Sequence, residues 1–294
     1  MSTAQIFVVV EGTDTDRWFY DQLCAQSPLL KRNRWLIWPV EQFTRHLSNA
    51  ARKGKNAVLE LFTQARNGGY LRVVNGSKSC SLLFCADADL DRFIGGMKRS
   101  NHLHYTKLPD VEAEVIKYCS LTRALASLAS IPASEADDIL KQSGDFHKTL
   151  GVAYTDLISL YCAAKKLGAQ RVPTLPKPED AREFPSDRLA GTEFAYEYKL
   201  VQASADCRPD EFDTQFKEFQ SKFQALASAR KSHSFLKGKW IRDYLFFELN
   251  EQLKSRSLPT IRAKDAITAV LRACCAPQGV SARMFTERLA TILA

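Results

Sequence analysis

Two apolar stretches in the first third of the chain each lead directly into an acidic residue. Residues 6–10 precede Glu11, and residues 82–86 precede Asp87, with Asp89 two positions later. An apolar run of this length indicates a strand that is buried on both faces of a parallel sheet. Because the carboxyl ends of parallel strands meet at one edge of a sheet, we expect the three acids to lie together there.

Acidic side chains gathered at one edge repel one another, and a bound cation removes that repulsion. Oxygen ligands on rigid strand ends suit Mg²⁺ or Mn²⁺. Asp87 and Asp89 are two residues apart, so in extended backbone both point to the same side and can reach one ion. The pattern therefore predicts a divalent-metal site for phosphoryl transfer, in which Glu11 acts as a metal ligand or as the general acid or base.

Three further acids extend the predicted site. Asp91 is a candidate for holding a second ion or its hydration water, and Glu112 at a predicted helix start is a candidate ligand. Asp16 lies in the first turn of a predicted helix, where the helix dipole favours a carboxylate, or it contributes to a second metal. The alternative for the whole set is a group of solvent-exposed turn residues.

Strand-like and helical runs alternate over about the first 120 residues, which is typical of an α/β domain with a parallel sheet. Helical periodicity dominates after residue 110. We predict a catalytic α/β domain over residues 1–122 and a mostly α-helical C-terminal domain over residues 123–294. The second domain would govern substrate access, partner binding or dimerisation. Phenylalanines recur in it at helical spacing, which favours a buried face over an exposed platform for nucleic-acid bases: Phe212, Phe216, Phe219 and Phe223.

Several classes of protein are disfavoured by what the sequence lacks. No run of eighteen apolar residues occurs, so no membrane span is expected, and the N-terminus does not resemble a signal peptide. The eight cysteines have no zinc-ligand spacing and are expected to be reduced thiols in a cytoplasmic protein. No phosphate-binding loop of the Gly-x-x-x-x-Gly-Lys-Ser/Thr kind occurs, so any ATPase activity is expected from a partner.

The formal net charge of +8 favours a polyanionic partner such as nucleic acid, although many basic proteins bind none. Two basic stretches are candidates for contacts with a nucleic-acid backbone. Their candidate residues are Arg52, Lys53, Lys55, Lys237, Lys239 and Arg242. Lys55 and Lys239 would also stabilise charge that develops on a phosphate oxygen. The alternative for these two is solvated surface lysine.

Several short motifs resemble the Toprim domain of topoisomerases, primases and nucleases. The pair Glu11-Gly12 and the pattern Asp87-x-Asp89-x-Asp91, each after a predicted strand, carry this resemblance. The longer stretch 10–20 resembles a subfamily of stand-alone Toprim proteins that are often encoded beside ABC-type ATPases. Further elements similar to that subfamily are Tyr105-Thr106, Asp110-Val111-Glu112, Gly54-Lys55 and Gly238-Lys239.

The resemblance implies a Toprim domain with a small parallel sheet flanked by helices, followed by a mostly helical C-terminal domain. It also implies a Mg²⁺-dependent or Mn²⁺-dependent nuclease. The subfamily includes the Toprim effector of the PARIS anti-phage system, and the overcoming-lysogenization-defect nucleases are more distant relatives. This implies a toxic endonuclease that cleaves tRNA and is held in check by an ABC-type ATPase.

Two alternatives stay open: a DNA nickase or endonuclease with the same site, and a non-catalytic subunit that binds metal or nucleic acid. Pairing of the C-terminal helices with a second copy of the chain also stays open, so a homodimer is one of the states considered.

Overall fold

The computed structural model describes residues 3–31, 33–46, 53–143, 145–175, 192–276 and 280–294 of the 294-residue chain. By their internal contacts, these residues form two compact units. The sheet unit contains Met1–Ala88, Met97–Tyr118 and Ala276–Ala294, and the helical unit contains Asp89–Gly96 and Cys119–Cys275.

The sheet has five strands in the described part of the chain, and four of them are mutually parallel. Their order is β2 (Arg34–Pro39), β1 (Thr3–Val10), β4 (Lys78–Ala86) and β3 (Arg72–Asn75), while β5 (Leu103–Tyr105) also pairs with β4. Strand β3 is antiparallel to β4, and the other pairs are parallel. The predicted α/β class is therefore confirmed: a small, mostly parallel sheet is flanked by helices, and a helical region follows.

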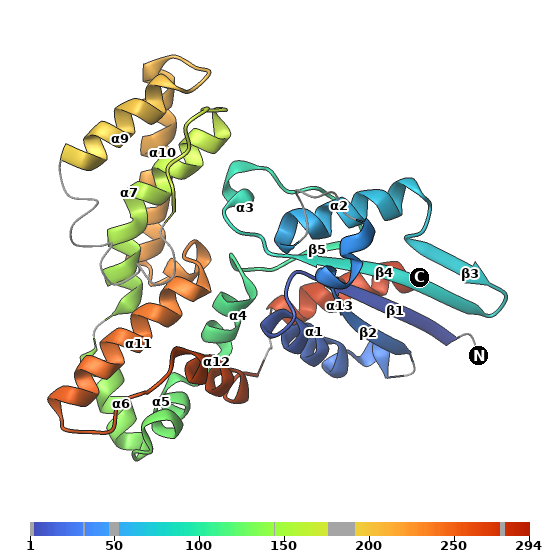
Figure 1. The fold of residues 1–294 in the computed structure, drawn as a ribbon, viewed down its shortest axis with the longest axis horizontal. Coiled ribbons are helices and arrows are strands. Elements are labelled where there is room, and N and C mark those ends of the chain that lie inside the picture. Colours follow the sequence, from blue (N-terminus) through green and yellow to red (C-terminus); the bar gives the residue numbers. More distant parts are fainter. Residues whose placement is uncertain (1–2, 32, 47–52, 144, 176–191, 277–279) are drawn as a thin grey trace. The chain divides into compact units, whose positions relative to one another are not determined.

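Helices cover both faces of this sheet (Figure 1). Helix α2 (Gly54–Asn67) lies on one face, and α1 (Thr15–Gln26) and α13 (Val280–Leu293) lie on the other. On the α2 side, the buried rings of Phe62 and Phe84 meet edge to face, with centroids 5.6 Å apart. On the other side, Tyr20 of α1 packs on Phe285 of α13, with centroids 5.7 Å apart. The short α4 (Val111–Tyr118) packs against α1.

The helical unit is built around the long pair α7 (Phe146–Lys166) and α10 (Pro209–Ser228). Its other helices are α3 (Asp91–Ile94), α5 (Leu121–Ala129), α6 (Ala133–Gln142), α9 (Thr192–Ala203), α11 (Gly238–Ser255) and α12 (Lys264–Ala273). All four phenylalanines of the predicted apolar face of α10 are buried, which confirms that this face is core. None of the helices in the described ranges has the length and the apolar character needed to cross a membrane.

The division into units differs from a single boundary near residue 122 in two places. Helix α13, at the C-terminal end, belongs to the sheet unit, and the short segment Asp89–Gly96 belongs to the helical unit. The sequence pattern cannot predict which unit α13 joins, because an apolar helix face does not specify the surface on which it packs.

A close approach between helices depends on Gly151 of α7. A Cβ atom at this position would overlap the buried hydroxyl of Ser232 and would stand 2.8 Å from the Cβ of the buried Ala227. We expect Gly151→Ala to lower the free energy of unfolding by about 1–3 kcal/mol, because the gain in helix propensity is smaller than the cost of overpacking. Val152→Ala is the matched control, since Val152 is 61% exposed. Equal urea midpoints for the two variants would contradict the expectation.

Candidate functional site

Glu11 and Asp87 lie at the same edge of the sheet, as the sequence predicts. Strands β1 and β4 are parallel neighbours, with Val9 paired to Phe84, and the two acids follow the ends of these strands. The backbone N–H of Asp87 donates a hydrogen bond of 2.6 Å to Oε1 of Glu11. Both side chains are half-buried. The two strand ends are therefore joined through the carboxylate that the sequence identifies as the main catalytic candidate.

Asp16 is buried beside the turn that follows β1. Its Oδ2 accepts a hydrogen bond of 2.6 Å from the backbone N–H of Gly12. A Cβ atom at position 12 would stand 3.1 Å from the same oxygen, so glycine permits this close approach. Asp16 thus holds the turn that carries Glu11, and it brings a further negative charge to this edge of the sheet.

A chain of buried hydrogen bonds supports the segment that follows Asp87. The backbone N–H of Ala88 donates to Oγ1 of Thr106 (2.8 Å), and that hydroxyl donates to the carbonyl of Leu108 (2.7 Å). The N–H of Leu108 donates to Oε1 of Glu114 (2.8 Å), and the hydroxyl of Ser281 donates to Oε2 of Glu114 (2.7 Å). These contacts connect the C-terminal helix α13 to the site. None of the supporting residues was among the predicted site residues, although Thr106 lies in one of the quoted motifs.

Asp110 is a further acid at the site, and it was not among the predicted site residues. Its Oδ1 accepts a hydrogen bond of 2.8 Å from the N–H of Ala113 and so caps the start of α4. Glu112 lies in the first turn of the same helix. The signal for Asp110 was present in the sequence, because an aspartate directly before a helical run is a typical N-cap.

Asp87 experiences the combined effect of these charges. Burial raises the pKa of its carboxyl well above the usual value, and the nearby carboxylates raise it further: Glu11, Asp16, Asp110 and Glu112. Such a carboxyl tends to keep its proton. A bound cation would reverse this tendency, because it would stabilise the ionised form.

Lys55 brings a positive charge to the same region. Its Nζ donates a hydrogen bond of 3.3 Å to the carbonyl oxygen of Ala88 and lies 5.7 Å from the centroid of the Tyr105 ring. The predicted Gly54-Lys55 element at the start of α2 therefore lies beside the end of β4. Gly54 has a φ of +71°, a left-handed conformation that glycine adopts without strain.

The donor atoms at this edge suit a hard divalent cation, because they are carboxylate oxygens. Among the described residues, however, no group of three or more aspartate, glutamate, histidine or cysteine side chains is arranged to hold a metal ion. One oxygen of Glu11 and one of Asp16 accept backbone hydrogen bonds instead. The chemistry of the donor set thus fits Mg²⁺ or Mn²⁺, and each of these two carboxylates keeps a second oxygen.

The backbone at Asp89 differs from the prediction. Strand β4 ends at Ala86, and Asp89 has a left-handed φ of +47°, so the expectation of an extended segment with Asp87 and Asp89 on one side is wrong. By its contacts, Asp89 belongs to the helical unit, where its Oδ1 is 3.2 Å from Nζ of Lys237. Asp91 is the first residue of α3 in the same unit.

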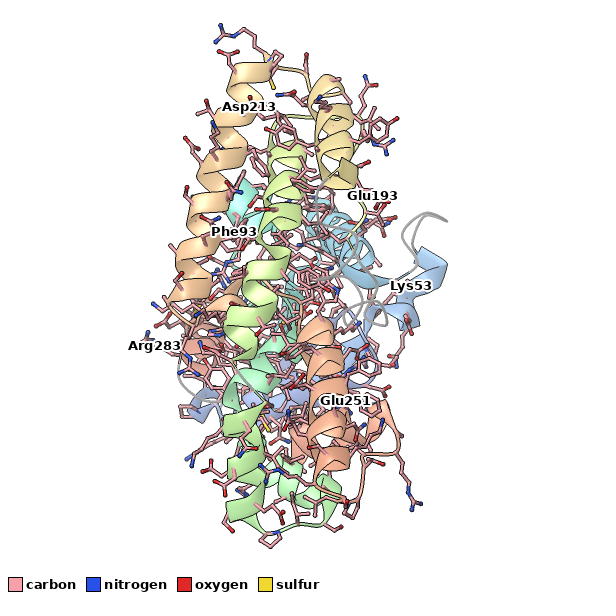
Figure 2. All side chains as sticks on the ribbon, turned by 90° about the vertical axis from the view of Figure 1, so that its left-hand side faces the viewer. Lys53, Phe93, Glu193, Asp213, Glu251 and Arg283 are labelled. Atoms are coloured by element: carbon pink, nitrogen blue, oxygen red, sulfur yellow. The ribbon has the colours of Figure 1, made fainter. Side chains whose placement is uncertain are left out.

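Of the predicted nucleic-acid contacts, Lys53 and Lys239 are exposed, and Lys53 is labelled in Figure 2. Arg242 is instead paired with Asp243, with Nη2 and Oδ1 2.9 Å apart, and the Asp243 carboxylate is buried. Lys237 is paired with Asp89. Arg52 lies outside the described residues.

Comparison of the sequence with protein-family models finds no match, and comparison with curated proteins finds none either. The assignment of a function therefore depends on the residues of this chain and on how they are arranged.

Proposed function

We propose that this protein is a divalent-metal-dependent endonuclease of the Toprim type, and that the acidic edge of its sheet is the catalytic site. The observation that carries the proposal is the meeting of Glu11 and Asp87 at adjacent strand ends, where burial, and then the charges of four nearby acids, raise the pKa of the Asp87 carboxyl. An arrangement of this kind is costly without a cation and is found where proteins bind metals or perform proton transfer. Neighbouring Lys55 favours a phosphate as the substrate group.

In this proposal, the residues of the site have separate roles. Mg²⁺ or Mn²⁺, when bound, would neutralise negative charge on the reacting phosphate. Glu11 and Asp87 are the main candidate ligands, and Glu11 is also the candidate for proton transfer at the scissile bond. The Lys55 ammonium would stabilise charge on a phosphate oxygen. Asp16 and Glu112, in the same unit as Glu11 and Asp87, stay candidates for further ligands, whereas the predicted Asp89, Asp91 and Lys239 belong to the helical unit.

The family resemblance favours RNA, and tRNA in particular, as the substrate. It also favours a role as a toxic cytoplasmic effector of anti-phage defence, controlled by an ABC-type ATPase partner. The DNA nickase or endonuclease is the alternative enzyme, since the same site chemistry acts on either phosphodiester.

The test compares wild type with Glu11→Gln and with Glu287→Gln, whose carboxylate is exposed on α13. Each protein is incubated with labelled tRNA, single-stranded DNA or duplex DNA in MgCl₂, MnCl₂ or EDTA. We expect wild type and Glu287→Gln to cleave tRNA only with a divalent ion, and Glu11→Gln to be slower by about 10³-fold. Cleavage of DNA but not of tRNA would instead support the DNA nickase or endonuclease. Calorimetric Mg²⁺ binding without cleavage, including in the presence of the ATPase, would favour the non-catalytic alternative.

A further inference from the structure

Two stretches that connect the sheet unit and the helical unit run side by side in opposite directions. The N–H of Ser120 donates to the carbonyl of Cys274 (3.2 Å), and the N–H of Ala276 donates to the carbonyl of Tyr118 (3.5 Å). Between these hydrogen bonds, Cys119 and Cys275 form an isolated antiparallel β-bridge. The two cysteines therefore face each other as a non-hydrogen-bonded pair.

The geometry of such a pair suits a disulfide. In non-hydrogen-bonded antiparallel pairs the Cα atoms are about 4.5 Å apart and the two side chains are on the same side. A disulfide needs a Cα separation of about 4.4–6.8 Å. Cys119 and Cys275 are both thiols and are half-buried, so a small reagent has access to them. The neighbouring Cys274 follows the last turn of α12 and also lies close enough to influence Cys119, so it is the competing thiol.

We propose that Cys119 and Cys275 form a disulfide when the protein meets a small-molecule disulfide such as oxidised glutathione. One cysteine thiolate attacks a sulfur of oxidised glutathione and releases one glutathione thiolate, which leaves a mixed disulfide. The second cysteine thiolate attacks this mixed disulfide at the protein sulfur and releases the second glutathione. Two protein thiols are thereby oxidised, oxidised glutathione is reduced to two thiols, and the released glutathiones take up the two protons.

The rate and the extent of this reaction have different causes. Burial and the neighbouring thiols Cys274 and Cys275 raise the pKa of Cys119 to about 12, so little of it is thiolate at neutral pH. Formation of the bond is therefore slow and becomes faster as the pH rises. The extent depends on the geometry of the bridge. The bond closes the long intervening chain into a loop, so the oxidised protein melts at a higher temperature than the reduced protein.

The test equilibrates the full chain in glutathione buffers of increasing oxidised fraction, followed by alkylation and mass spectrometry of non-reduced peptides. Wild type and the control Cys274→Ser lose two alkylatable thiols and yield a peptide that joins positions 119 and 275. Cys119→Ser and Cys275→Ser keep the partner thiol alkylatable and show no rise in melting temperature. A crosslink through Cys274, or retention of both thiols in fully oxidised glutathione, would overturn the proposal.

A second, independent observation concerns cations that stand over aromatic rings in the helical unit. Lys222 Nζ lies 4.9 Å and Arg92 Cζ lies 5.5 Å from the centroid of the Phe93 ring. Figure 2 labels Phe93, which lies on α3 beside α7 and α10. Lys166 Nζ lies 5.6 Å from the ring centroid of Phe219.

The exposed lysines lie at the protein surface over packed rings, of which Phe219 and Phe223 are buried. Phe93 meets Phe223 with centroids 5.0 Å apart, and Phe223 stacks on Phe219 at 6.1 Å. Lys165 adds a charge 6.0 Å from the Tyr161 ring, on the same end of α7 as Lys166. The three lysines Lys165, Lys166 and Lys222 are exposed, and within the described part of the chain none of them forms an ion pair with a carboxylate.

We infer that this surface binds the phosphate backbone of the nucleic-acid substrate, an inference that rests on the proposed function. The rings restrain the lysine side chains, so less conformational freedom is lost when a phosphate binds. The cations already stand over these rings, so the surface contacts phosphates and not bases. Binding here is therefore independent of base sequence and depends strongly on salt.

The test measures fluorescence anisotropy of labelled tRNA over a range of NaCl concentrations, in a Glu11→Gln background that prevents cleavage. Removal of three charges by Lys165→Gln, Lys166→Gln and Lys222→Gln is expected to reduce the slope of log affinity against log salt by about two. The control removes three other exposed lysines of the same unit, by Lys141→Gln, Lys199→Gln and Lys254→Gln.

Equal slopes for the two triple variants would overturn the inferred surface. If wild type cleaves tRNA while the first triple variant binds it normally, only this surface fails and the proposed function stands. If the Glu11→Gln chain binds no nucleic acid and wild type cleaves none, the proposed function itself fails. If the first triple variant binds tRNA normally but no longer co-purifies with an ATPase, the surface binds a protein partner and not the nucleic acid.

Discussion

Asp87→Asn is expected to stabilise the metal-free protein and, at the same time, to abolish its response to Mg²⁺. The Asp87 carboxyl is half-buried among four other acids, and asparagine has nearly the same shape without the charge. In EDTA we expect the melting temperature to rise by roughly 2–4 °C, which corresponds to about 1 kcal/mol in a domain of this size. In Mg²⁺ at about 100 times the dissociation constant, wild type should gain about 2.7 kcal/mol and the variant far less.

The same substitution should reduce metal-dependent cleavage by about 10³-fold. Thermal melts in EDTA and in MgCl₂, together with cleavage rates, measure the three effects. Glu287→Gln is the control for loss of one carboxylate from the same unit, and it should behave as wild type. A variant that melts below wild type in EDTA, or that responds equally to Mg²⁺, would contradict the role assigned to Asp87.

The stabilisation by Asp87→Asn should also depend on pH in a defined direction. The folded-state pKa of Asp87 is raised above its unfolded value of about 3.9, so the folded chain retains a proton that the unfolded chain releases. The stability that this proton contributes is fully present below the unfolded pKa and is lost as the pH rises through the folded pKa. The advantage of the asparagine variant should therefore grow as the pH rises from about 4.

His104 changes stability with pH in the opposite direction. Burial and the charge of Arg288 lower its pKa to about 3, so stability falls as the pH decreases from about 6.5 towards 3. This contribution is common to wild type and Asp87→Asn. Melting temperatures of both proteins at each pH, compared as differences, thus isolate Asp87. A difference that shrinks with rising pH would show that the pKa of Asp87 is not raised.

Glu114→Ala should cause the largest loss of stability. Glu114 has an exposed fraction of 0%, and its two oxygens accept hydrogen bonds from Leu108 and Ser281. Alanine leaves both donors buried without this acceptor and also leaves a cavity. We expect the free energy of unfolding to fall by about 3–5 kcal/mol. Hydrogen exchange at the Leu108 and Ala88 amides should accelerate, because the chain of hydrogen bonds continues through Thr106 to Ala88.

Glu114→Gln separates the loss of hydrogen bonding from the loss of volume. It keeps the shape and one acceptor oxygen, so we expect a smaller loss of about 1–2 kcal/mol. Urea unfolding, followed by signals from the sheet unit, measures both variants beside Glu287→Gln. If Glu114→Ala and Glu287→Gln unfold at the same urea concentration, the buried network does not support the sheet edge.

The sequence was most informative where the signal is local. The apolar runs before Glu11 and Asp87 predict strands, and their shared direction places both acids at one edge of the sheet. The spacing of the phenylalanines in α10 predicts a buried face, which the structure confirms. The family resemblance marks Gly54-Lys55, and Lys55 contacts the Ala88 carbonyl. For the strands and for α10, the periodicity of the chain determines which side a residue occupies.

Prediction failed where contacts join distant parts of the chain. Glu114 and Ser281 are 167 residues apart, and no local sequence pattern predicts the hydrogen bond between them. The left-handed backbone of Asp89 is not signalled by glycine at that position. Arg242 looks like part of a basic run, but Asp243 is buried and pairs with it. A run of positive charge in a sequence thus says little about which charges are available to a ligand.

By itself, therefore, the sequence determined the α/β class, the two main acids at the sheet edge and the buried face of α10. These follow from hydrophobic periodicity and chain direction, which act over a few residues. Only the tertiary structure decided that α13 returns to the sheet unit, that Asp89 pairs with Lys237, and that Cys119 faces Cys275. Those contacts depend on how the chain closes over long separations, because many apolar faces and charged groups could satisfy the same local pattern.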